Sequence, residues 1–406
     1  MKINKHCFPN GLRLVHYEDT STQMVALNIV YDVGARDEHP EHTGFAHLFE
    51  HLMFGGSAHI PDYDTPLQLA GGENNAWTNN DITNYYLTVP KPNVETAFWL
   101  ESDRMLELAF SEQSLEVQRG VVMEEFKQRC LNQPYGDVGH LFRPLAFRVH
   151  PYCWPTIGKE LSHIEQATLD EVKSFFYRFY APNNAVLAVT GNISWDETVK
   201  LTEKWFAPIP RRDVPVRQLP QEPEQTQERR LTVERNVPLD ALFMGYHMCS
   251  REGADYYAFD ILSDILSNGR SSRLNRRLVQ EQNIFSGIDA YISGTRDAGL
   301  LQISGKPAAG VSLEQAEAAV RKELEELQRS PVDGQELEKV KNKFESTQIF
   351  GNINYLNVAT NLAWFELTGK AEDIDLEVER YRSVTTEQLH TVAQRTFCES
   401  NAVVLY

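Results

Sequence analysis

Two histidines and a glutamate lie close together in the segment 45–54, which reads Phe-Ala-His-Leu-Phe-Glu-His-Leu-Met-Phe. His47 and His51 are four residues apart, so in a helix both imidazoles project from one face. Glu50 precedes His51 by one residue and can reach a water molecule between the two imidazoles. Neutral imidazoles are good ligands for Zn²⁺, and a neighbouring carboxylate that does not bind the metal can act as a general base. The spacing therefore predicts a zinc site on a helix.

The same residues could also belong to a buried helix that carries two hydrogen-bonded histidines and no metal. The surrounding sequence favours the metal site. A polar, turn-rich stretch at 37–44 leads into the helix, and Thr43 is its predicted N-cap. A purely structural helix gains nothing from burying three ionisable side chains, because each must then be paired or neutralised.

Length and composition restrict the classes of protein to consider. The chain has 406 residues, enough for two or more domains, and its 42% hydrophobic and 10% aromatic residues are typical of globular proteins. Its formal net charge of −18 argues against a nucleic-acid partner, because no basic excess is available to neutralise phosphates.

The cysteines and the hydropathy bear on location. The five cysteines are scattered and never spaced as Cys-x-x-Cys, which indicates reduced thiols instead of a disulfide framework. The first residues are basic but are followed by no apolar segment typical of a signal peptide. No apolar run is long enough to cross a bilayer. We therefore expect a cytoplasmic protein without a membrane span.

Hydrophobic periodicity and turn signals predict alternating strands and helices in the first half of the chain. Expected strands are 3–8, 12–17, 25–31, 84–89 and 185–190, and expected helices are 45–54, 61–70, 93–108, 114–130 and 169–180.

The most informative feature of the whole chain is an internal repeat. Thr168 and Asn184, at the start of a helix and of the following strand, recur as Thr385 and Asn401, and the sequence offset is 217 in both cases (385 − 168 and 401 − 184). The predicted strand at 25–31 matches the segment 242–248 at the same offset. The repeat predicts an α+β fold made of two homologous domains, each a mostly antiparallel sheet packed with helices. The predicted boundaries are a first domain at 1–215, a proline-rich linker at 216–230, and a second domain at 231–406.

The repeat also bears on function. In the second copy, the helix that corresponds to the histidine-bearing one is expected near Ala258 to Leu266, and it contains no histidine. The cluster is therefore an addition to the fold and is not required by it.

Two histidines alone hold zinc poorly, so a third ligand is expected on another helix. The helix at 114–130 offers Glu116, Glu124 and Glu125 around an apolar stretch. The pattern itself does not choose among these carboxylates.

Four segments together resemble the pitrilysin (insulinase) family of zinc peptidases, in its half-length, two-domain form. They are the His47-x-x-Glu50-His51 segment of the inverzincin type, the Gly-Gly-x-x-Asn-Ala-x-Thr stretch at 71–78, the Val-Val-Met-Glu-Glu stretch at 121–125, and the Gly-Arg-Ser-Ser-Arg-Leu stretch at 269–274. The resemblance covers essentially the whole chain and implies the pitrilysin-like metallohydrolase fold. It also implies that Glu125 is the third zinc ligand, with Glu124 as the alternative. The separation of His51 and Glu125 along the chain is slightly short for the family.

The resemblance further implies a zinc-dependent endopeptidase that acts on peptides or unfolded segments. Zinc held by His47, His51 and Glu125 would activate a water molecule, and Glu50 would serve as the general base. The segment Asn75, Ala76, Trp77 and Thr78 resembles the family's edge strand, which holds substrate as an added β-strand. The alternative interpretation of Asn75 is a simple turn residue after Gly72.

Two departures from the family pattern matter. A glutamate that often precedes the third ligand by seven residues is replaced here by Gln118. The arginine and tyrosine with which active relatives bind the substrate and the oxyanion fall on Leu278 and Phe285, and Arg277 and Tyr291 are out of register. We therefore expect a second pitrilysin-like subunit to supply an Arg/Tyr pair in a heterodimer, with a homodimer as the weaker option. A non-catalytic structural or peptide-binding subunit of a larger complex is the alternative function.

Overall fold

The computed structural model describes all 406 residues and divides the chain into two compact units. The first unit comprises residues 1–131, 154–219 and 349–376, and the second comprises 132–153, 220–348 and 377–406. The chain thus passes several times between the units, and the second unit begins well before the predicted linker at 216–230. No helix is both long enough and apolar enough to cross a membrane.

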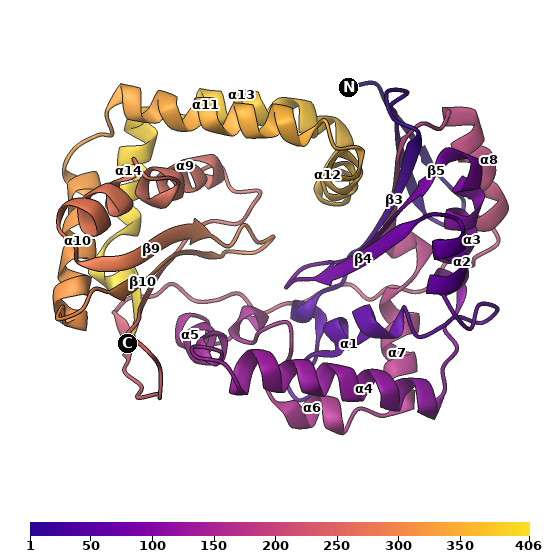
Figure 1. Cartoon of the computed structure of the whole chain (residues 1–406), viewed down its shortest axis with the longest axis horizontal. Helices are drawn as coiled ribbons and strands as arrows, with labels where there is room; N and C mark the ends of the chain where they lie inside the picture. The colour runs from indigo at the N-terminus through magenta and orange to yellow at the C-terminus, as the bar shows by residue number, and fades with distance from the viewer. The chain divides into compact units, whose positions relative to one another are not determined.

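The first unit is built on a six-stranded sheet in the order β1-β2-β6-β3-β5-β4 (Figure 1). Only β2 and β6 run parallel to each other, and all other neighbours are antiparallel. The strands are β1 (Ile3–Cys7), β2 (Arg13–Glu18), β3 (Met24–Tyr31), β4 (Glu73–Thr78), β5 (Thr83–Pro90) and β6 (Ala185–Gly191). The helices are α1 (Phe45–Leu52), α2 (Asp64–Leu69), α3 (Val94–Leu106), α4 (Glu112–Phe126), α6 (Leu161–Glu165), α7 (Leu169–Phe179), α8 (Trp195–Trp205) and α12 (Tyr355–Thr368).

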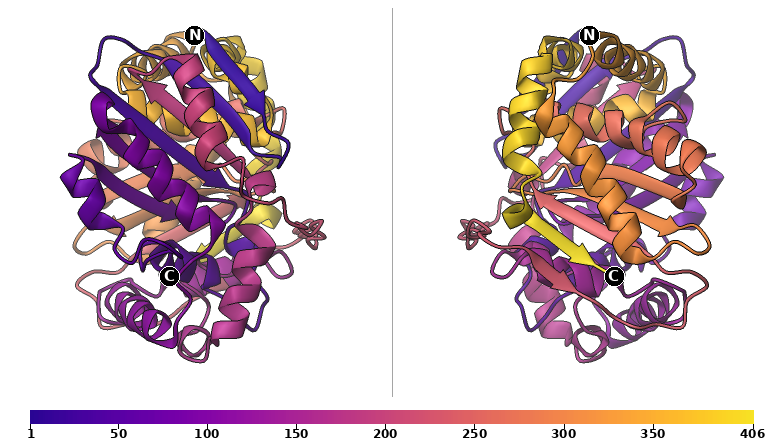
Figure 2. Two further views of the ribbon diagram at one scale, coloured as in Figure 1. Left: turned by 90° about the vertical axis from the view of Figure 1, so that its right-hand side faces the viewer. Right: turned by 90° about the vertical axis from the view of Figure 1, so that its left-hand side faces the viewer.

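The second unit has a five-stranded sheet in the order β7-β11-β8-β10-β9. Its strands are β7 (Arg229–Leu231), β8 (Leu242–His247), β9 (Phe285–Ile292), β10 (Leu300–Pro307) and β11 (Ala402–Leu405). Its helices are α5 (Val138–Ala146), α9 (Tyr256–Ser267), α10 (Leu313–Arg329), α11 (Gly334–Gly351, whose last residues fall in the first unit), α13 (Glu377–Ser383) and α14 (Thr386–Thr396). In Figure 2, α10 and α14 can be followed beside β11 in the right-hand view.

The two sheets confirm the repeat. The starts of β5 and β10 differ by the same offset as the predicted repeat, as do the starts of β6 and β11 and those of α7 and α14. When β2, β6, β3, β5 and β4 are matched to β7, β11, β8, β10 and β9, the strand orders are identical, and β1 alone has no counterpart. The expected α+β class with two homologous halves is therefore confirmed.

The central strands of each sheet are buried on both faces, and the helix on one of these faces comes from the other copy of the repeat. In the first unit, Leu362 of α12 packs in an apolar cluster with Ala26 and Val186 of the sheet. In the second unit, Phe142 of α5 packs with Val403. The starts of these two helices also differ by the offset of the repeat, so the helices are equivalent and are exchanged between the sheets. The predicted domain boundaries at residues 215 and 230 follow the repeat in the sequence. They do not describe this exchange of helices, because the repeat gives the order of the elements along the chain and not their packing.

The other face of the first sheet carries the helix of the predicted zinc site. Phe45, Leu48 and Phe49 of α1 are buried in the large core that also contains strands β3 and β5 and helices α3 and α7. Burial of this apolar stripe fixes the orientation of α1 and turns its polar residues away from the sheet.

Candidate metal and peptidase site

The helix α1 brings the two histidines of the predicted site together. His47 and His51 lie one turn apart, and their ring centroids are separated by 4.9 Å. His47 is buried, and its burial lowers the pKa of the imidazole to about 4. The ring is therefore neutral at physiological pH, which is the form that binds a metal.

Helix α4 adds Glu125 to this pair. Its Oε2 atom lies 3.6 Å from Nε2 of His47 and 3.3 Å from Nε2 of His51. One potential ligand atom from each of the three residues lies within 4.8 Å of the others. Two imidazoles and one carboxylate facing a common point are the donor set of many catalytic zinc sites. The arrangement fits a zinc ion, and the three residues are those that the resemblance implied.

The alternative ligand, Glu124, points elsewhere. Its side chain is 56% exposed and approaches Lys127 and Gln128 on the following turn. Adjacent helix residues project about 100° apart, so only one of the two glutamates can face α1. The geometry favours Glu125 as the third ligand.

Glu125 is held by more than the histidines. Its Oε1 atom is 2.8 Å from the Arg129 guanidinium, on the short π-helical segment Lys127–Leu131 that continues α4. Hydrogen bonding from His51 is the largest effect that lowers the pKa of Glu125, with smaller contributions from His47 and Arg129. The carboxylate is therefore ionised, and it directs Oε2 toward the two histidines and Oε1 toward Arg129. Gln118, where the resemblance implies a supporting glutamate, lies on α4 beside Gly55.

Glu50 lies on α1 between the two histidines and is partly buried. Burial raises the pKa of its carboxyl, and the neighbouring Thr78 side chain and His51 act in the opposite direction. A carboxylate with a raised pKa in a partly desolvated site is suited to accept and return a proton.

The predicted substrate-binding segment is part of a strand at the edge of the first sheet. Asn75, Ala76, Trp77 and Thr78 belong to β4, which pairs only with β5. The strand has an unpaired side that can accept an added strand. The turn interpretation of Asn75 is therefore wrong.

The residues of β4 alternate between the two faces of the sheet. Ala76 packs against the core that contains α1, whereas Trp77 packs in the apolar cluster around α12. The strand therefore places Ala76 on the side of the sheet that carries α1 and Trp77 on the side that α12 covers. Asn75 also accepts a hydrogen bond of 2.8 Å from the backbone N–H of Ala76.

In the second copy, the positions of the expected Arg/Tyr pair are occupied by core residues. Leu278 and Phe285 are fully buried in the apolar core of the second unit. Arg277 forms ion pairs with Glu323 and Glu326 on α10. Tyr291 lies on the edge strand β9 and is half exposed. The positions that align with the pair thus offer no polar group to a substrate.

The start of α1 differs from the expected one. The N-cap is Gly44, with a left-handed φ of 88°, so the prediction of Thr43 is wrong. The Thr43 hydroxyl instead contacts Nδ1 of His163 at 2.9 Å and accepts the N–H of Lys159. The backbone N–H groups of Gly44 and Ala46 donate to the buried carboxylate of Glu38. The sequence did not predict a role for Glu38 or Arg129. Its only signal was that Glu38 is an acidic residue upstream of the helix.

Comparison with known proteins places these features in a family. Residues 13–135 match the family described as Insulinase (Peptidase family M16), and residues 166–344 match the Peptidase M16 inactive domain. The chain belongs to the pitrilysin/insulinase family, in its half-length, two-domain form.

Individual relatives agree with this assignment. The chain is 29% identical to the zinc protease PqqE of Helicobacter pylori over 338 residues, which cover 82% of this chain and 76% of that protein. It is 25% identical to the uncharacterized zinc protease YmxG of Bacillus subtilis, over 99% of this chain and 98% of that one. The crystal structure of a protease from Helicobacter pylori superposes with a TM-score of 0.94 at 26% identity, covering 100% of this chain and 98% of the other. The names of these curated relatives support Zn²⁺ as the cofactor of the family.

Proposed function

We propose that this chain is a zinc-dependent endopeptidase that hydrolyses peptides or unfolded segments. The observation that carries the proposal is the convergence of His47, His51 and Glu125 beside Glu50, next to an open strand edge. A zinc ion held by these three residues would supply a Lewis acid that polarises the peptide carbonyl and makes a water molecule acidic enough to react near neutral pH.

Different residues of the protein then align the substrate and transfer the proton. The edge of β4 aligns the substrate backbone by strand addition, which depends little on side chains and so suits varied peptides. Glu50 takes a proton from the attacking water and delivers it to the departing amine. Its partly buried position limits competition from bulk water, and Arg129 holds the Glu125 carboxylate in place.

We further propose that the active form is a dimer with a second pitrilysin-like chain. Support comes from the second copy, in which Leu278 and Phe285 are buried and cannot contact a substrate. A partner that carries an arginine and a tyrosine at these positions would complete the site, and a homodimer is the weaker option. None of the five cysteines forms a disulfide, which supports the cytoplasm as the compartment.

The test is a peptide-cleavage assay on the purified chain, with zinc content measured on the same samples. Glu50→Gln should keep about one zinc per chain and lower kcat by roughly 10²- to 10⁴-fold, because only the proton transfer is lost. Glu124→Gln is the matched control, since it makes the same chemical change on an exposed side chain, and it should leave both quantities unchanged.

The outcomes separate the proposals. Zinc binding with cleavage only after a partner chain is added would support the dimer, and full activity of the chain alone would contradict it. A chain that binds no zinc would contradict the peptidase and favour a structural or peptide-binding subunit.

A further inference from the structure

The first turn of α1 is held by a residue that lies outside the proposed zinc site. Glu38 is 7% exposed, and its two carboxylate oxygens accept different backbone N–H groups. Oε2 is 2.9 Å from the N–H of Gly44, and Oε1 is 2.8 Å from the N–H of Ala46. These groups belong to the N-cap residue and the second residue of the helix. The first turn of a helix lacks internal acceptors for its N–H groups, so Glu38 satisfies donors that would otherwise be buried without partners.

No other side chain performs this role. Gly44 has no side chain with which to cap the helix, and no side-chain cap is present at its start. Thr43 directs its hydroxyl to His163 and Lys159. When Glu38 is ionised, its negative charge also lies at the positive end of the helix dipole, where it is favourable.

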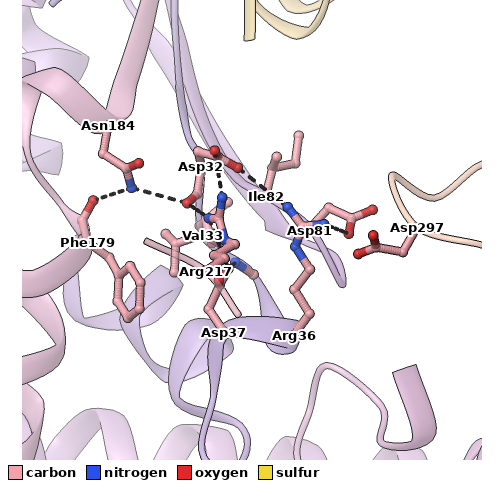
Figure 3. A network of polar contacts seen from close by, with 12 residues as sticks. Asp32, Val33, Arg36, Asp37, Asp81, Ile82, Phe179, Asn184, Arg217 and Asp297 are labelled. Atoms are coloured by element: carbon pink, nitrogen blue, oxygen red, sulfur yellow. Dashed lines mark hydrogen bonds and ion pairs between the residues drawn. The ribbon is translucent and has the colours of Figure 1, made fainter. Parts of the chain in front are cut away.

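Glu38 is itself fixed, because the loop that carries it is anchored to the sheet by ion pairs (Figure 3). The Arg217 guanidinium pairs with Asp37 and, at 2.7 Å, with Oδ2 of Asp32 at the end of β3. Arg36 pairs with Asp81 at 3.2 Å, in the loop that precedes β5. Asp37 in turn accepts the N–H of Gly34. Both neighbours of Glu38 on its N-terminal side are therefore held to the sheet.

These contacts connect the sheet to the proposed zinc site through Glu38 and the first turn of α1. His47 directly follows Ala46, whose N–H is bound by Glu38, and Glu125 reaches His47 from a different helix. A shift of the first turn of α1 would change the distance between His47 and Glu125 while leaving the more distant His51 less affected.

We propose that Glu38 is a positioning residue of the zinc site, which holds the first turn of α1 so that His47 and Glu125 converge on the same ion. This inference rests on the proposed zinc site. It assigns to Glu38 no contact with metal or substrate. Residues that support metal ligands without touching the metal typically change metal affinity by about 10- to 100-fold when they are replaced.

The experiment measures the zinc dissociation constant of the full chain with a competing chelator at pH 8.5, well below the melting temperature. Glu38→Gln should weaken zinc binding by about 10-fold or more, because the amide keeps the shape but replaces one acceptor oxygen by an NH₂ group that faces an N–H donor. Glu41→Gln makes the same change on an exposed residue of the same loop and should have no effect. Amide hydrogen exchange of the segment 44–48 should increase in Glu38→Gln only.

The result that overturns the inference is a lower melting temperature of Glu38→Gln with an unchanged zinc dissociation constant, which would show a role in stability alone. If Glu38→Gln does not fold, Glu38→Asp replaces it, since the shorter carboxylate keeps the charge but cannot reach both N–H groups. Absence of zinc binding by the wild-type chain would instead contradict the zinc site itself, so the two failures are distinguishable.

Discussion

The helices that follow the central strands β3 and β8 carry different polar groups. The helix α9 follows the central strand β8 as α1 follows β3, but it carries no histidine. At its end lie Asp264 and Asn268, next to Lys343 of α11. Asn268 donates to Asp264 at 2.7 Å, and the Lys343 ammonium donates to Asn268. The second copy thus has a lysine ammonium bound at the end of α9, whereas the first copy gathers potential metal ligands on α1 and α4.

This difference shows which feature the two copies share, namely a polar contact between two helices. In both copies, a polar contact links the helix that follows the central strand to a later helix. The Asn268 amide and the Lys343 ammonium are sufficient for that contact, and they provide neither a metal site nor a general base. That contact therefore does not require the histidines and Glu50 of the first copy, and the match to the family's inactive domain, residues 166–344, covers much of the second copy.

A second comparison concerns the exchanged helices α5 and α12. Each belongs by sequence to one copy and packs on the sheet of the other unit. Because each sheet obtains one of its two covering layers in this way, neither copy would bury its sheet on both faces if it were separated from the other. Each copy therefore depends on the other for one covering layer of its sheet, although only the first copy bears the candidate zinc site.

The largest expected effects come from removing the anchors of the exchanged helices. Phe142→Ala on α5 and Leu362→Ala on α12 should each lower the free energy of unfolding by about 2–5 kcal/mol, because both side chains are buried in apolar clusters. Hydrogen exchange should show that Phe142→Ala loosens β11 and that Leu362→Ala loosens β2 and β6. If each variant instead loosened the sheet of its own copy, the exchange of helices would be contradicted.

A smaller effect is expected from removing the third ligand, and it should be confined to the first copy. Glu125→Gln should weaken zinc binding by more than about 100-fold, since loss of a ligand exceeds the usual effect of a supporting residue. In the second copy, Lys343→Met should leave zinc binding unchanged and alter the free energy of unfolding by less than about 1 kcal/mol, because its contacts are exposed. Chelator competition and urea unfolding measure the two quantities. Loss of zinc affinity in Lys343→Met would show that the copies do not act independently.

The sequence predicted these copies well wherever the information was local or periodic. The spacing of His47 and His51 and the apolar stripe of α1 define one helix, and the constant offset predicted the matching sheets. The choice between Glu124 and Glu125 could not be made from spacing, because it depends on how α4 is rotated against α1. Glu38 was missed because its partners are defined by the path of a loop. No helix was predicted at the position of α12, and the apolar residues of a helix do not show which sheet it covers.

The smallest effects concern two carboxylates whose surroundings differ between the copies. In the first copy, burial raises the pKa of Glu38 to about 8, and its neighbours Asp37 and Trp154 supply no compensating cation. In the second copy, Glu317 on α10 is contacted by Arg230, Arg321 and Tyr406, and these contacts outweigh burial and lower its pKa to about 2. The two groups should therefore give stability opposite dependences on pH.

The signs follow from proton binding. The unfolded chain releases the Glu38 proton near pH 4.5 and the folded chain near pH 8, so this residue's contribution to stability is lost as pH rises between these values. For Glu317 the folded pKa is the lower one, so its contribution is present above about pH 4.5 and is lost as pH falls toward 2. Denaturant unfolding of the zinc-free chain should show a decline from pH 5 to pH 8 that is flatter in Glu38→Gln, and a decline from pH 4.5 to pH 3 that is flatter in Glu317→Gln. Equal slopes in a variant and the wild type would mean that the acid in question does not titrate differently on unfolding.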